Sequence, residues 1–157
     1  MDQIQRAWYE NLIASDYSGR TVTFHRDRLN AIACIAALFR DLRPGRYFVG
    51  HWEENLLASL CWRTSPPDKL QGTNQRQALD YQAPSWSWAS QNCPVYFTGR
   101  HDFEPIAEIL SVQTDVDTSN PFGEVNGGFL KLRAPVSRGL YAPCRSACPL
   151  RGKTKSG

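Results

Sequence analysis

Tryptophan is the most conspicuous residue type with chemical potential in this 157-residue chain, which holds five of them. Trp52 and Trp62 bracket a leucine-rich segment, and Trp86 and Trp88 alternate with small residues. Exposed indole rings could stack on a sugar, a base or a cation. Buried indoles would instead contribute about 2–3 kcal/mol each through the apolar area they remove from water. We expect the second role, in which the rings pack in a dry interior.

Histidine and cysteine lack the spacing of a metal site. His25, His51 and His101 are scattered along the chain, and Cys144 and Cys148 form one pair without a second. Tetrahedral zinc needs four ligands, so we predict no metal. The five cysteines are an odd number without a regular framework, which is typical of reduced thiols in an intracellular protein.

Other reactive side chains also lack a catalytic pattern. Ser18, His25 and Asp27 include the residue types of a hydrolase triad, but no nucleophile-elbow glycines flank the serine. Glu53 and Glu54 are adjacent, and on a helix they would point about 100° apart. They suit the positive end of a helix dipole better than paired acid–base chemistry. The sequence therefore predicts a protein that is not an enzyme and binds no cofactor.

Helices are expected to position the residues of the first third of the chain. We predict a short helix over 4–14 and a second that follows an N-cap at Thr23, has Asp27 in its first turn and ends at Pro44-Gly45. A third should run from about His51 to Trp62. The apolar positions repeat every three or four residues; they are Ile4, Trp8 and Leu12, then Leu29, Ile32, Ala33, Ala36 and Phe39, then Trp52, Leu56 and Leu60.

The spacing changes from helical to alternating after a polar stretch. We predict strands at 86–90, 95–97, 106–114 and 129–133. Asn126-Gly127 favours a tight turn, which would pair a short strand at 122–125 with the last strand. Helices that precede strands predict an α+β fold, with three amphipathic helices and a small antiparallel sheet. The expected organisation is a helical segment 1–63, a polar loop 64–82, a β-rich segment 83–137 and a disordered tail 138–157.

Composition and charge exclude several classes of protein. The chain is 41% hydrophobic and 21% charged, as is usual for a globular protein. Its +3 charge comes from residues 138–157, which hold five basic and no acidic side chains, so a nucleic-acid surface on the body is not indicated. Neither a membrane-spanning stretch nor a signal-peptide core is present in the sequence. We expect a cytoplasmic protein without a membrane partner.

Three stretches occur in the order and spacing of one known family. The first holds Trp8, Tyr17-Ser18-Gly19-Arg20, Thr23, Asp27, Arg28, Leu29 and Ala31; the second holds Tyr47, Gly50, Trp52, Leu57, Leu60 and Trp62; the third is Ala83-Pro84-Ser85-Trp86-Ser87-Trp88-Ala89-Ser90. Together they resemble the region that follows the signalling domain of fungal heterokaryon-incompatibility (HET) proteins. The sequence departs from this pattern at Asn30, Cys34 and His51, where the family commonly has proline, glycine and leucine.

The resemblance implies a fragment with a scaffolding role. It would be an interaction region in heterokaryon incompatibility, an innate-immunity-like response that ends in programmed cell death. Its partners would be proteins, either its own upstream HET domain or other incompatibility proteins. Two alternatives remain, a small-molecule or glycan-binding module that uses exposed tryptophans, and an accessory half of an NAD-cleaving signalling enzyme. Structural roles are implied for Trp8, Tyr17, Ser18, Arg20, Thr23, Asp27, Leu29, Gly50, Trp52, Trp62, Pro84, Ser85, Trp86 and Trp88.

Overall fold

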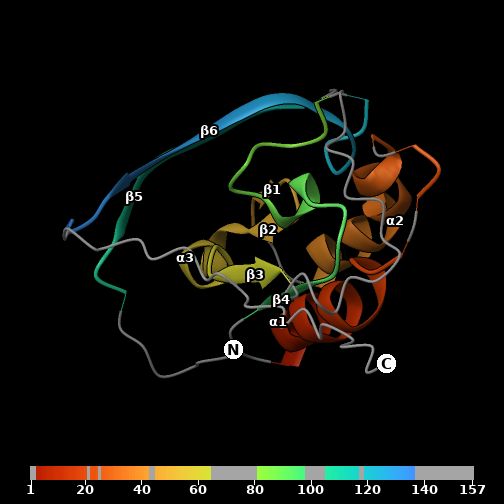
Figure 1. The fold of residues 1–157 in the computed structure, drawn as a ribbon, viewed down its shortest axis with the longest axis horizontal. Coiled ribbons are helices and arrows are strands. Elements are labelled where there is room, and N and C mark those ends of the chain that lie inside the picture. Colours follow the sequence, from red (N-terminus) through yellow and green to blue (C-terminus); the bar gives the residue numbers. More distant parts are fainter. Residues whose placement is uncertain are drawn as a thin grey trace, which may run out of the picture.

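The computed structural model describes residues 3–20, 22–24, 26–42, 45–64, 81–97, 105–116 and 119–136. Within these residues the fold is α+β, as predicted, and its strands form three two-stranded antiparallel sheets rather than one. Two helical segments lie on one side of the molecule and a long two-stranded ribbon lies on the other (Figure 1). Short strands and a single helical turn lie between them.

The first helical segment is longer than predicted and changes type along its length. The α-helix α1 (Gln3–Arg6) continues into a π-helical segment (Ala7–Tyr17), which ends with the Ser18 N–H bonded to the Ile13 carbonyl at 2.9 Å. Hydrogen bonds between residues five positions apart widen each turn of the helix. They also change which residues face inward. The buried aromatic and aliphatic residues are Trp8, Tyr9, Ile13 and Tyr17, whereas Ile4 and Leu12 are only half-buried.

The second helix, α2 (Asp27–Leu42), buries the predicted face. Its buried apolar residues are Leu29, Ile32, Ala33 and Ala36, and Phe39 is half-buried. Thr23 is not the N-cap, so that prediction is wrong. The helix begins only at Asp27, whose N–H bonds the Phe24 carbonyl at 3.0 Å, so the turn before the helix replaces a side-chain cap. Pro44, half of the predicted stop signal, lies outside the described residues.

The predicted third helix is mostly replaced by other structure. β1 (Tyr47–Phe48) and β2 (His51–Trp52) form a minimal antiparallel pair, followed by a 3-10 turn (Glu53–Asn55) and one helical turn, α3 (Leu56–Ser59). Trp52 has an extended backbone, with φ of −104° and ψ of 137°; it pairs with Tyr47, and its N–H donates to the Tyr9 hydroxyl at 2.9 Å. Trp62 opens β3 (Trp62–Thr64) rather than closing a helix.

The segment that contains the third motif stretch is also not a strand. Residues 85–87 turn, and Trp88–Ser90 form a short 3-10 helix in which the Ser87 hydroxyl caps the Ala89 N–H at 3.1 Å. The strand predicted at 86–90 is therefore wrong, because a local side-chain cap outweighs the alternating pattern. The strand predicted at 95–97 is confirmed as β4 (Val95–Phe97), which pairs with β3.

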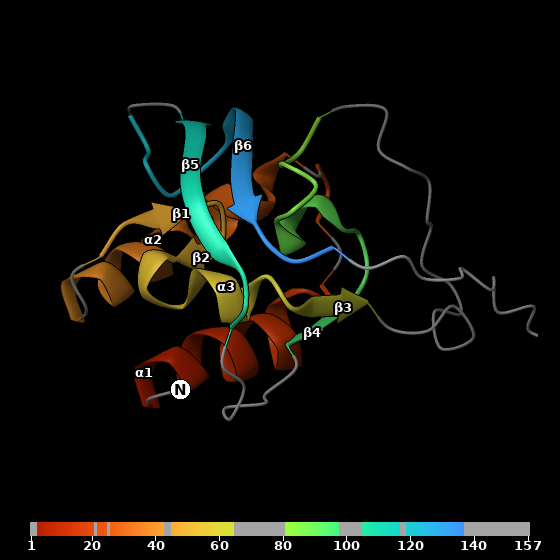
Figure 2. The ribbon, with the colours of Figure 1, turned by 90° about the vertical axis from the view of Figure 1, so that its left-hand side faces the viewer.

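The long ribbon consists of β5 (Glu108–Val116) and β6 (Val125–Arg133), so both predicted strands are confirmed with shifted ends (Figure 2). The predicted turn at Asn126-Gly127 is wrong. Gly127 lies within β6 opposite Asp115, and the register shift between Asp115 and Val116 leaves Asn126 as an extra residue. Asn126 therefore lies at a β-bulge rather than in a hairpin turn.

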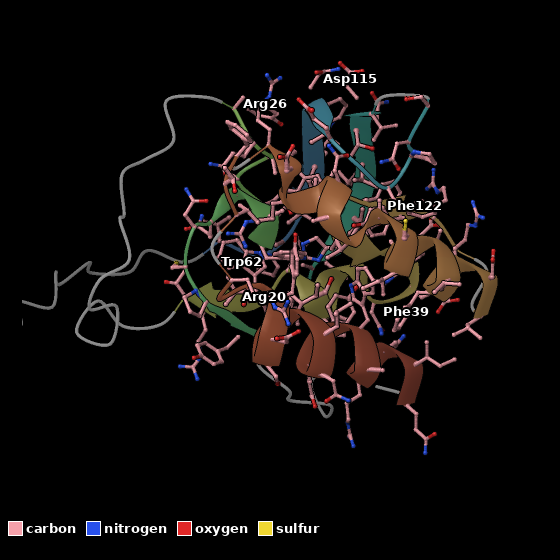
Figure 3. The ribbon with its side chains drawn as sticks, turned by 90° about the vertical axis from the view of Figure 1, so that its right-hand side faces the viewer. Arg20, Arg26, Phe39, Trp62, Asp115 and Phe122 are labelled. Atoms are coloured by element: carbon pink, nitrogen blue, oxygen red, sulfur yellow. The ribbon has the colours of Figure 1, made fainter. Side chains whose placement is uncertain are left out.

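The core lies between the helices and the short strands, and aromatic side chains dominate it (Figure 3). Trp8 is the centre of this cluster. Its ring lies 5.0 Å from that of Phe39, 6.1 Å from that of Tyr47 and 5.6 Å from that of Trp52, all edge to face. Edge-to-face pairs contribute about 0.5–1.5 kcal/mol each beyond area burial. These contacts join α2 and the β1–β2 pair to the N-terminal helical segment.

Several predictions concern residues outside the described part of the chain. These are the disordered tail, nearly all of the polar loop at 64–82, and the side chains of His25, His101, Cys144 and Cys148. At the ends of that loop, Thr64 belongs to β3 and Gln82 is buried. Within the described residues, every helix is too short or too polar to cross a membrane.

Candidate functional site

The turn between β1 and β2 brings the three motif stretches together. The indole N–H groups of Trp8 and Trp88 both donate to the Gly50 carbonyl oxygen, each at 3.1 Å. The donors are 42 and 38 residues from the acceptor in sequence. A carbonyl oxygen has two lone pairs, so one buried acceptor satisfies two buried donors. The most distinctive residues of each stretch therefore meet at one oxygen atom.

The backbone of this turn explains the requirement for glycine at position 50. Gly50 has φ of 93°, and a Cβ atom there would overlap the Trp88 ring. Val49 before it also has a positive φ, at 49°, and its carbonyl accepts from the Ser87 hydroxyl at 2.6 Å. A positive φ is unfavourable for the β-branched Val49, whereas glycine adopts it readily. Hydrogen bonds from the third motif stretch hold this turn in place.

A second buried set of contacts surrounds Arg28. The Tyr17 hydroxyl donates to the Arg28 carbonyl, and the guanidinium donates to the Ser18 carbonyl at 3.3 Å. The Ser18 hydroxyl in turn accepts the Val95 N–H at 3.0 Å, which ties β4 to the first helical segment. Burial lowers the pKa of Arg28 and raises the pKa of Tyr17. Ser18 is therefore a structural hydroxyl and not an accessible nucleophile.

The remaining motif residues divide into interior and surface positions. The Trp62 indole donates to the Trp86 carbonyl at 2.9 Å, which joins β3 to the third stretch. Arg20 is exposed and pairs with Asp16 at 2.8 Å. Buried positions are Trp8, Tyr17, Ser18, Leu29, Gly50, Trp52, Pro84 and Trp88; half-buried ones are Trp62 and Trp86; exposed ones are Arg20, Thr23, Asp27 and Ser85.

The burial of three tryptophans argues against an indole binding platform. Trp8 and Trp88 are fully buried and Trp52 is 8% exposed, whereas Trp62 and Trp86 are half-buried. The arrangement predicted from the sequence, in which the indoles share a dry interior, is confirmed for Trp8, Trp52 and Trp88. Any ligand surface in the described part of the chain must therefore use side chains other than these three.

A buried pair of a histidine and a serine was not predicted from the sequence. His51 Nδ1 lies 2.7 Å from the Ser59 hydroxyl, which itself donates to the Leu56 carbonyl at 3.0 Å. The histidine must therefore be the donor, so Nε2 is an unprotonated acceptor, and it has no partner. Burial lowers the His51 pKa to about 3. Because the ring is fully buried, this serine–histidine pair has no access to a substrate.

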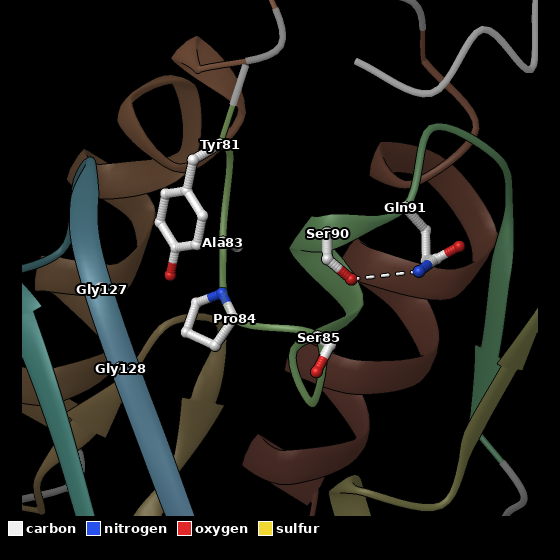
Figure 4. A pocket seen from close by; sticks show the side chains of 8 residues that line it. All are labelled: Tyr81, Ala83, Pro84, Ser85, Ser90, Gln91, Gly127 and Gly128. Carbon is white, nitrogen blue, oxygen red and sulfur yellow. Dashed lines mark hydrogen bonds between the residues drawn. The ribbon is translucent and has the colours of Figure 1, made fainter. Parts of the chain in front are cut away.

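A surface cavity of about 670 Å³ lies beside the third motif stretch (Figure 4). Its lining residues are Tyr81, Ala83, Pro84, Ser85, Ser90, Gln91, Gly127 and Gly128. Pro84 and Ser85 of the motif thus contact open space, which no feature of the sequence indicated. The signal that could have suggested it is the combination of small polar residues around the tryptophans with paired glycines far along the chain.

Comparisons with known proteins were made against family models, curated proteins and solved structures. None of them gave a match. Among the described residues, no group of three or more histidine, cysteine, aspartate or glutamate side chains could hold a metal ion. The features available to a functional argument are therefore the buried motif network, the exposed apolar side chains and the cavity.

Proposed function

We propose that this chain is a non-catalytic scaffold and interaction region of a HET protein, acting in the cytoplasm in heterokaryon incompatibility and regulated cell death. The observation that carries the proposal is the meeting of Trp8, Gly50 and Trp88 at one carbonyl oxygen. The three stretches that resemble the family are far apart in sequence, and their shared residues bond to one another. This supports a common fold as the reason for the resemblance.

The non-catalytic role is supported by how the polar motif groups are used. The hydroxyls of Tyr17, Ser18 and Ser87 all bond backbone groups in the interior. Each bond of this kind contributes about 0.5–1.5 kcal/mol, and an unmade one costs about 1–3 kcal/mol. Selection for stability is therefore sufficient to explain these residue types, without a reaction.

The interaction role is supported by apolar side chains at one end of the ribbon, where β5 begins and β6 ends. Glu108 pairs with Arg133 at this end. The exposed apolar residues around the pair are Ile106, Leu110, Leu132 and Val136, and Ile106 and Val136 are 80% and 96% exposed. Exposed apolar groups gathered at one end of an element can mark a protein interaction surface. We propose that this ribbon end contacts the signalling domain that precedes the corresponding region in HET proteins.

Titration calorimetry of this chain with the signalling domain of a HET protein tests the interaction. We expect binding, and we expect the double substitution Ile106→Ser/Leu132→Ser to weaken it at least about tenfold, because about 1.4 kcal/mol of apolar contact would be lost. Leu38→Ser, at another exposed leucine on α2, is the matched control and should leave the affinity unchanged. Absence of binding would contradict the proposed interaction.

A separate assay tests the non-catalytic role. NAD consumption is measured for the isolated chain and for the full-length protein with and without this region. We expect no turnover by the isolated chain. Turnover by the isolated chain would show that the proposal is wrong, whereas turnover that requires both parts would favour the accessory half of an NAD-cleaving enzyme.

A further inference from the structure

We propose that the cavity beside the third motif stretch binds a neutral saccharide. Two unlike walls form it (Figure 4). Tyr81 and Pro84 line one side, and Ser90 and Gln91 line the other, with Ser85 between them. The first wall is mainly apolar and the second is polar. A pyranose ring is divided in the same way, since its C–H bonds form an apolar face and its hydroxyls project from the edge. The inference is independent of the proposed scaffold role.

The exposed part of the apolar wall is the Tyr81 ring. Tyr81 is 47% exposed, so its ring is open to a ligand, while Pro84 is buried against β6. The face of an aromatic ring is negative and attracts the weakly positive C–H groups of a sugar. The Tyr81 hydroxyl is protonated at neutral pH and can donate a hydrogen bond.

The polar wall is pre-organised. The Ser90 hydroxyl donates to the Ser87 carbonyl at 2.7 Å and accepts from Gln91 Nε2 at 3.1 Å. This holds the Gln91 amide nitrogen at the Ser90 oxygen, with the carbonyl oxygen turned away from Tyr81 and Pro84 (Figure 4). The amide nitrogen has a second N–H that can donate to a ligand hydroxyl. The exposed Ser85 hydroxyl can donate as well as accept. Such an alternation of donors and acceptors suits neighbouring sugar hydroxyls, each of which also donates and accepts.

The backbone of β6 completes the cavity. Gly127 and Gly128 line it without side chains, and a Cβ atom on Gly128 would lie 2.8 Å from Pro84 Cγ. Glycine is thus needed for the close approach of β6 to the apolar wall. None of the lining residues is charged, which disfavours a phosphate or carboxylate ligand. The volume of about 670 Å³ falls within the usual range for ligand pockets.

NMR titration of the full chain tests the site, with cellotriose and chitotriose as probes and glucose 6-phosphate and a neutral tripeptide as comparisons. We expect saturable amide shifts with at least one trisaccharide, confined to the lining residues. Glucose 6-phosphate should bind more weakly because no cation faces the cavity. Shifts centred elsewhere, no response to either trisaccharide, or a response to the tripeptide alone would overturn the proposal.

Variants separate this site from non-specific contact. Tyr81→Ala and Gln91→Ala should each weaken the trisaccharide affinity at least about fivefold, the effect of losing one stacking or hydrogen-bonding contact. Tyr81→Phe keeps the ring and should retain most of the trisaccharide affinity. Phe24→Ala removes another exposed aromatic ring, 68% exposed, and should have no effect. If Phe24→Ala weakened the trisaccharide affinity as much as Tyr81→Ala, the response would not be specific to the cavity.

Discussion

Gly50 is the residue on which the buried network depends most directly. Its carbonyl accepts from two indoles, its φ of 93° suits only glycine, and its missing side chain makes room for the Trp88 ring. A turn conformation, a close approach and a hydrogen-bond acceptor thus coincide at one position. Substitution there should affect all three at once.

We predict that Gly50→Ala lowers the free energy of unfolding by at least about 2 kcal/mol, since it adds backbone strain and breaks buried hydrogen bonds. Urea denaturation followed by circular dichroism measures this. Gly45→Ala is the matched control, because no atom lies within 4 Å of a Cβ built there. Equal stability of the two variants would contradict the role given to the Gly50 turn.

His51 gives the molecule a pH-dependent stability. Its pKa is about 3 in the folded chain and about 6.5 in an unfolded chain. Between these values only the unfolded state binds the proton, so stability from this residue is full above about pH 6.5 and falls as the pH decreases. The cause is burial of a ring whose Nε2 has no partner to stabilise a charge.

We predict that lowering the pH from 7 to 5 reduces the free energy of unfolding by about 2 kcal/mol through His51 alone. The variant His51→Leu places an apolar side chain of similar size in the same position. Between pH 7 and pH 5 its free energy of unfolding should fall by about 2 kcal/mol less than that of the unsubstituted chain. Urea denaturation at several pH values provides the comparison. Parallel pH profiles for the two proteins would exclude His51 as the cause.

At the scale of elements, secondary structure is predicted best for segments whose apolar residues all lie on one face. α2 is the element whose helical pattern is clearest, and its buried face is the predicted one. The segment from His51 to Trp62 has a helical leucine pattern, but at its start Trp52 is extended, pairs with Tyr47 and bonds the Tyr9 hydroxyl through its N–H. Local pattern cannot reveal a partner 43 residues away.

Asn30, on α2, makes two hydrogen bonds to the connection between β5 and β6. Asn30 Oδ1 accepts the Glu124 N–H at 3.0 Å and the Asn120 side-chain amide at 3.3 Å. Next to it, Arg26 and Glu124 form an ion pair at 2.7 Å. The resemblance pointed to Asn30 only as a departure from the family, with no indication that it anchors the ribbon.

We predict that Asn30→Ala lowers the free energy of unfolding by about 1 kcal/mol and speeds hydrogen exchange at the Glu124 amide, because that N–H loses its acceptor. Arg26→Gln, which removes only the exposed ion pair, should cost less than about 0.5 kcal/mol. Native-state hydrogen exchange and urea denaturation measure both effects. An unchanged Glu124 exchange rate in Asn30→Ala would contradict the anchoring role.

At the scale of the whole molecule, the sequence predicted the fold class and the burial of Trp8, Trp52 and Trp88. It did not predict the division into three small sheets, because pairing depends on turns such as Val49-Gly50 whose conformation is imposed by distant hydroxyls and indoles. The cavity was also missed. Its walls come from 81–91 and from β6, and nothing in either segment alone indicates the other.

Hydrogen exchange of the tryptophan indole N–H groups, followed by ¹⁵N NMR, tests the buried network most directly. The structure predicts that the Trp8 and Trp88 signals exchange slowly and at the same rate, set by global unfolding, since both bond the Gly50 carbonyl inside the core. Rapid exchange of either indole under native conditions would show that the three motif stretches do not share a closed interior.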